Sequence, residues 1–291
     1  MPSRLPHDLL QHQCCPETHR NMLALALGEE ERAIIDTMPM LLWAVKHKIQ
    51  HAVFCACIGR AQRAISALAQ SLVTLELIDI DPCPILPLLK DLTHLRGLSI
   101  AMSVGFAPGR CCDSSLNLSA LPSSLESLRL VRVHCRVELP AAIESLSISF
   151  VHRKKQLPKV KGSERRLTHL RLDKCDVDAG TVQEILETHP GLVSLELPRN
   201  PCTAVYGLPR GHASLVSLEL PRFVRSTVND IVCLLDGRFP VLKTLVVDQA
   251  PGDDALEVGC RAAGITLVKA GSKQPRTRGD LLGAGLETRV R

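Results

Sequence analysis

The chain has 291 residues, a net charge of +5, and a composition that is 45% hydrophobic but only 2% aromatic. This hydrophobic content is too high for a disordered protein, and the mild charge favours neither a dedicated nucleic-acid binder nor a protein of membrane surfaces. Because rings are scarce, a folded core must be filled by Leu, Ile and Val, which is typical of thin layers that repeat along a chain.

The first 70 residues carry apolar side chains at helical spacing in three segments, 29–35, 41–49 and 52–68, and Pro39 separates the first two. The pattern predicts an N-terminal helical region. Histidines and cysteines gather near the start of the chain, at His7, His12, Cys14, Cys15 and His19. They lack the two spaced cysteine pairs of a structural zinc site, so we expect no metal. No secretory signal or membrane span is visible, which favours a cytoplasmic or nuclear protein with reduced cysteines.

One pattern, Leu-x-x-Leu-x-Leu with Ile or Val allowed, recurs between residues 71 and 270. Its first positions are Leu72, Leu95, Leu125, Ile143, Leu167, Leu192, Leu215 and Leu242. Side chains alternate across a strand, so the two later leucines of each motif point inward while their neighbours face solvent. One such unit cannot bury its leucines alone, and the units are therefore predicted to stack into a continuous parallel sheet. A last strand is expected at 265–268, and the unequal spacing on either side of Leu125 predicts a distortion near Arg129.

These motifs resemble the leucine-rich-repeat superfamily over roughly residues 70–270. The unit that begins at Leu167 is similar to the cysteine-containing subtype, with Cys175 after the strand, a turn at 178–180 and a helix-like segment at 181–188. The resemblance implies an α/β solenoid, in which a curved parallel sheet has a helical or irregular convex side and residues 1–70 form an N-terminal helical cap. It also implies that Cys175, and Asn200 at the equivalent position, satisfy backbone groups in the turn after the strand.

Two further resemblances bear on function. Residues 5–10, Leu-Pro-His-Asp-Leu-Leu, resemble the opening of F-box domains, although Cys14-Cys15-Pro16 departs from that pattern. An F-box would make residues 1–70 an adaptor region rather than a cap. The short units at 121–125 and 139–143 resemble the Leu-Pro-x-x-Leu repeats of bacterial effectors.

Motifs of catalysis are not found in the sequence, which holds no P-loop, nucleophile elbow or dinucleotide fingerprint. His134 and Cys135 are adjacent, but neighbours on an extended segment point to opposite sides. We therefore expect no enzyme and no cofactor. The basic stretch at 153–166 is interpreted as a solvated loop, a contact for an acidic partner or a nuclear-import signal, and residues 271–291 as a basic flexible tail.

The concave face of such a solenoid can be read from the strand positions that face solvent. We predict that a protein partner is bound there, through Glu76, Arg129, Ser147, His169, Arg171, Glu196 and Glu219. Arg129 and Arg171 are the expected anchors, since Arg is enriched among residues that dominate binding energy. Glu196 and Glu219 would repel phosphate, so the face suits a polar protein partner better than a nucleic acid. No membrane and no small-molecule substrate are expected either.

Three functions remain open from the sequence. The first is a non-catalytic protein-interaction module that uses the concave face. The second is an F-box-type substrate-receptor subunit of a ubiquitin ligase, in which the repeats hold the substrate and residues 5–50 dock the ligase core. The third is an enzyme inhibitor or secreted effector.

Overall fold

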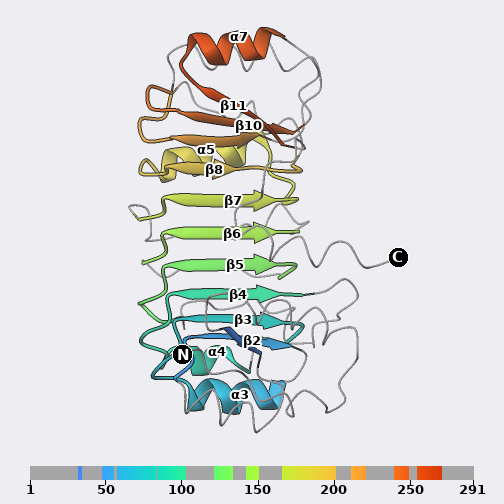
Figure 1. Ribbon diagram of the computed structural model, residues 1–291, viewed down its shortest axis with the longest axis vertical. Coiled ribbons are helices and arrows are strands. Elements are labelled where there is room, and N and C mark those ends of the chain that lie inside the picture. The colour runs from blue at the N-terminus through green and yellow to red at the C-terminus, as the bar shows by residue number, and fades with distance from the viewer. Residues whose placement is uncertain are drawn as a thin grey trace, which may run out of the picture.

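The computed structural model describes residues 32–34, 48–55, 58–82, 84–102, 121–133, 142–150, 166–200, 211–220, 239–248 and 254–270. Within these ranges, eleven strands form one sheet whose order is the order of the sequence. The strands are β1 (Arg32–Ile34), β2 (His51–Cys55), β3 (Thr74–Ile78), β4 (Gly97–Ala101), β5 (Ser127–Val131), β6 (Ser145–Ser149), β7 (His169–Asp173), β8 (Ser194–Glu196), β9 (Ser217–Leu220), β10 (Thr244–Asp248) and β11 (Thr266–Ala270). Figure 1 shows them stacked in one continuous, all-parallel sheet of solenoid-like, α/β type.

Equivalent motif positions face one another along the sheet. Leu98 pairs with Leu75 on one side and with Leu128 on the other, and the same registration continues to β10. Arg129 faces Ser99 and Ser147 without a break in pairing. The distortion expected near Arg129 is therefore not found in the strand pairing, because the differences in unit length fall in the connections and not in the strands.

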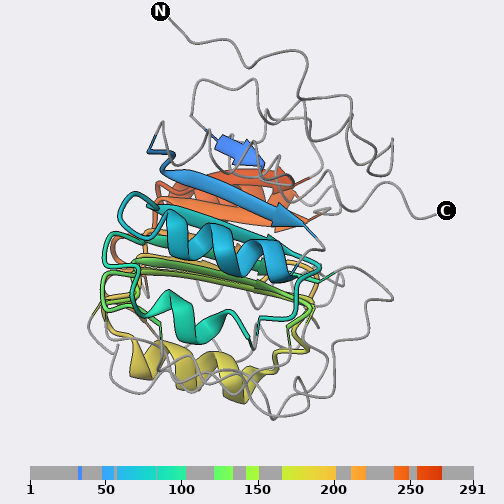
Figure 2. The same cartoon turned by 90° about the horizontal axis from the view of Figure 1, so that it is seen from below.

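The core lies on one face of the sheet. Leu128 and Leu130 of β5 are fully buried, whereas Ser127 at the start of the strand is exposed. Most other motif strands alternate in the same way, and in β8 the first residue, Ser194, is buried as well. Among the described residues, four helices contribute to this core: α3 (Ile58–Ala67), α4 (Leu86–Leu89), α5 (Ala179–Thr188) and α7 (Asp254–Ala262). Figure 2 shows a curved sheet with α3, α4 and α5 on its outer side, and Figure 1 places α7 beyond β11 at the end of the stack.

The turn after β7 is held by the side chain of Asn200 from the next unit. Its Oδ1 accepts hydrogen bonds from the backbone N–H groups of Cys175 at 2.9 Å and Val177 at 3.4 Å, and its Nδ2 donates to the carbonyl of Leu172 at 2.6 Å. The Cys175 thiol donates to the carbonyl of Ile148 at 3.4 Å. Both side chains thus satisfy buried backbone groups, as the resemblance implied. The chain then enters α5, where the helix predicted over 181–188 begins slightly earlier.

The helical prediction for the N-terminal region is wrong at two places. Residues 32–34 and 51–55 are strands, and the described helix of this region spans only Ile58–Ala67. Ile49, Ala52 and Phe54 occupy the three apolar motif positions, and each is only 2% exposed. A short apolar run fits the helical and the strand period equally well, and pairing with β3 decides between them. The sheet therefore begins before residue 71.

We predict that substitutions in β2 follow the period of a strand. Phe54→Ala should lower the free energy of unfolding by about 3 kcal/mol, because it empties a buried site. Val53→Ala, on the half-buried opposite face of the same strand, should cost about 1 kcal/mol or less. Urea denaturation of both variants measures the difference. Equal losses would contradict the strand assignment.

Candidate functional site

Two columns of side chains cross the strands on the face that no described helix covers, and we call this the polar face. The central column, half-buried throughout, consists of Val53, Glu76, Ser99, Arg129, Ser147, Arg171, Glu196, Glu219, Val246 and Val268. The first column consists of His51, Thr74, Gly97, Ser127, Ser145, His169, Ser194, Ser217, Thr244 and Thr266. These columns are what a partner approaching this side of the sheet would meet.

The structure brings the seven residues predicted from the sequence onto this one face. Six of them lie in the central column, and His169 lies beside Arg171 in the first column. The first column is mostly Ser and Thr. At Gly97 a Cβ atom would lie 3.2 Å from Cγ2 of Thr74, so a larger side chain there would crowd its neighbour. Partner binding by these residues stays a prediction.

Arg171 of β7 is held by two glutamates, Glu196 of the neighbouring strand β8 and Glu219 of β9, the strand after it. Its Nη1 lies 2.6 Å from Oε2 of Glu196 and 3.9 Å from Oε2 of Glu219. Burial pulls the pKa of Arg171 down, but the negative charges of Glu196 and Glu219 and the hydrogen bond to Glu196 together raise it above its ordinary value. The guanidinium is thus engaged within the protein, and Arg171 is a less accessible anchor than the sequence suggested.

Arg129 has a different environment. It is half-buried, its strand neighbours are Ser99 and Ser147, and the described part of the chain gives it no hydrogen bond or ion pair. The Oγ of Ser99 is also buried without a hydrogen-bond partner among the described residues. A guanidinium withdrawn from water without an acceptor is unfavourable. Arg129 therefore offers donors that a carboxylate or carbonyl of a partner could satisfy.

A second group of polar side chains lies where the middle strands end. Arg132, Phe150, Lys174 and Arg199 each follow a strand at the equivalent position and have positive φ values of 56°, 62°, 51° and 56°. The backbone N–H of Arg132 still donates to Ser149, that of Phe150 to Asp173, and that of Lys174 to Pro198. The ladder of hydrogen bonds thus extends one residue beyond the strands before the chain turns away from the sheet.

The four side chains form what we call the strand-end cluster. The Cζ of Arg132, the Nζ of Lys174 and the Cζ of Arg199 lie 4.4, 4.7 and 5.3 Å from the centre of the Phe150 ring. Arg199 also pairs with the buried carboxylate of Asp173, its Nε lying 2.8 Å from Oδ1. Sequence reasoning missed this cluster. The available signal was a basic residue at the same offset from the motif in three units.

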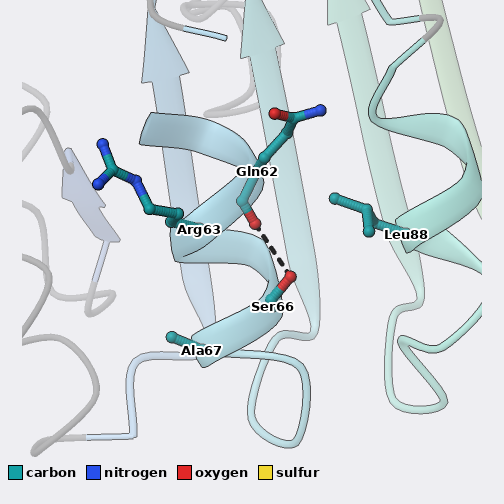
Figure 3. A pocket seen from close by; sticks show the side chains of 5 residues that line it. All are labelled: Gln62, Arg63, Ser66, Ala67 and Leu88. Atoms are coloured by element: carbon teal, nitrogen blue, oxygen red, sulfur yellow. Dashed lines mark hydrogen bonds between the residues drawn. The ribbon is translucent and has the colours of Figure 1, made fainter. Parts of the chain in front are cut away.

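A shallow hollow between α3 and α4 is lined by Gln62, Arg63, Ser66, Ala67 and Leu88, as Figure 3 shows. Its one drawn hydrogen bond runs from the Ser66 hydroxyl to the Gln62 carbonyl, so no acid, base or nucleophile is assembled there. Cys175 and Cys260 are buried free thiols, and burial raises the pKa of Cys260, which makes it a poor nucleophile.

Several sequence predictions fall outside the described residues. They are the His- and Cys-rich start with the F-box-like residues 5–10, the pair His134 and Cys135, residues 153–165 of the basic loop, and the tail 271–291. In the ranges that are described, no cluster of three His, Cys, Asp or Glu side chains could hold a metal ion, and no helix has the length and apolarity to cross a membrane.

Comparisons with protein-family models, with curated proteins and with solved structures found no match to this chain. The function is therefore inferred from the polar face and the strand-end cluster themselves.

We predict that Arg171 and Glu196 are coupled energetically. A double-mutant cycle of Arg171→Gln and Glu196→Gln should give a coupling of about 0.5–1 kcal/mol, because each side chain is about a third exposed and the pair is partly screened.

Thermal or urea unfolding at low and high salt measures this coupling. High salt should reduce it, because mobile ions screen half-exposed charges. A coupling of zero at low salt would contradict the ion pair.

Proposed function

We propose that this chain is a non-catalytic interaction module of the leucine-rich-repeat type that binds a protein partner on its polar face. Support for the repeat assignment comes from the eight motifs, which fall on eight consecutive strands of one parallel sheet in matching register. Support for the binding face comes from its composition, since half-buried charged side chains alternate there with small Ser and Thr residues over many strands.

The observation that carries the proposal is the contrast between Arg129 and Arg171. Two glutamates satisfy Arg171, whereas Arg129 is half-buried between two serines and pairs with no described group. A partner carboxylate placed over Arg129 would receive charge-assisted hydrogen bonds from donors that are already partly desolvated. Small neighbours on both sides leave room for the partner's backbone to come close. Arg129 is therefore the proposed anchor of the interface.

The chemistry of the partner follows from the charges beside the anchor. Glu196 and Glu219 lie side by side in the central column, next to Arg171, so that end of the column carries more acidic than basic side chains. A complementary partner presents an acidic side chain to Arg129 and a basic one toward the glutamates. Such a pattern suits a folded protein or peptide and disfavours a polyanion lying along the whole column.

We predict that Arg129→Glu abolishes binding of the partner to the polar face. The tagged full chain and the variant are used as baits in extracts of the cells that express it, and the bound proteins are quantified by mass spectrometry. The matched control is Lys90→Glu, which makes the same charge change at an exposed residue at the end of α4, on the helical side of the sheet. Proteins retained by the control and lost from Arg129→Glu are partners of the polar face.

The affinity of a partner found in this way should fall about tenfold or more with Arg129→Glu, the loss typical of a residue that dominates an interface. Exchange of the contacting acidic residue of the partner for Arg should restore binding in part. If wild type, control and Arg129→Glu retain the same proteins in equal amounts, the proposed anchor is wrong.

A further inference from the structure

The strand-end cluster holds more positive charge than the described residues neutralise. Arg132, Lys174 and Arg199 converge on the ring of Phe150 from the ends of β5, β7 and β8. Asp173 pairs with Arg199. Within the described residues, Arg132 and Lys174 form no ion pair, although both are half-buried. Within the part of the chain that the structure describes, Arg132 and Lys174 therefore lack a counter-charge, and the strand that leads to Phe150 lies between the strands that lead to them.

Contact with the ring fixes these cations without consuming their hydrogen-bond donors. A cation–π contact attracts the charge to the ring and needs no acceptor atom. Of the donors on Arg132, only Nη1 has a partner in the described part of the chain, the carbonyl of Met102 at 3.4 Å. The ammonium group of Lys174 has the ring as its only described partner. Both groups are thus positioned in advance, with donors left for an external acceptor.

We propose that the strand-end cluster binds an acidic segment of a partner polypeptide, whose carboxylates bridge Arg132 and Lys174. Charge complementarity supports this occupant, and so does the number of separate cations at the edge. Several carboxylates linked in one chain engage neighbouring cations together and gain effective concentration, whereas a single small anion at half-exposed groups is screened by salt.

A single-stranded nucleic acid is a poorer fit to the same charge. Such strands are held by stacking of bases on exposed rings together with contacts to the phosphates. Phe150 has three cations within 5.3 Å of its centre, so its faces are already engaged. The described hollow between α3 and α4 lies apart from the cluster and adds no pocket for a base. Carboxylates need only the donors, which are available.

This site is separate from the polar face in its residues and in its test. Arg132 and Lys174 lie beyond the ends of β5 and β7 and belong to neither column of the polar face. The cluster could therefore bind an acidic segment even if Arg129 proves not to anchor a partner, and the reverse also holds.

The test uses the purified full chain and a fluorescent octaglutamate peptide, with octaglutamine and oligothymidylate as comparison probes. Fluorescence anisotropy at moderate salt should show binding of octaglutamate but not of octaglutamine. In the variant Arg132→Gln/Lys174→Gln, the affinity for octaglutamate should fall about tenfold or more, because charge-assisted hydrogen bonds are lost. The control Lys90→Gln/Lys243→Gln removes two exposed charges elsewhere and should bind like wild type.

Two further variants keep the test decisive. Lys174→Gln alone, which leaves the contact of Arg132 with the ring, replaces the double variant if the latter unfolds early, and it should still weaken binding several-fold. Phe150→Leu keeps both cations but loosens them, and it should also weaken binding. The proposal is overturned if wild type does not bind octaglutamate, if both double variants bind it equally well, or if oligothymidylate binds more tightly through the same residues.

Discussion

Burial of the motif leucines against those of the next unit is the interaction on which the rest of the structure depends. A unit of one strand and its return has no interior of its own, so Leu128 becomes buried only because Leu98 and Leu146 lie on either side of it. Full burial of such a side chain stabilises the fold by about 2–3 kcal/mol. Because leucine must stack on leucine, the register of the sheet follows, and with it the alignment of the polar columns on the opposite face.

The same requirement explains which strands could be predicted from the sequence. The strands from β3 to β10 carry three apolar residues at fixed spacing, and that spacing is the direct consequence of burial on one face of a strand. In β2 the positions are filled by Ala52 and Phe54, and the neighbouring apolar residues also fit a helix. A local pattern could not resolve this, because the strand forms only by pairing with β3.

The candidate site, too, could be predicted from the sequence only in part. Alternation along a strand was enough to predict that Arg129, Arg171 and Glu196 share a face. It did not show that Arg171 pairs with a glutamate while Arg129 lies beside serine. That difference depends on the pairing of side chains between strands, which alternation along one strand does not predict. The strand-end cluster was missed because it follows the strands, in a backbone conformation that Phe, Lys and Arg adopt rarely and that no sequence pattern predicts for them.

The positive φ values lower the stability of the backbone at the same positions whose side chains are proposed to bind a partner. Glycine adopts positive φ freely, whereas each larger residue there carries a strain on the order of 1 kcal/mol. The chain nevertheless has Arg132, Phe150, Lys174 and Arg199 at these positions. Redesign for thermal stability alone would favour glycine at all four positions, and it would erase the cluster while improving the backbone. A stabilised scaffold made in this way would keep its sheet and lose one of its two polar surfaces.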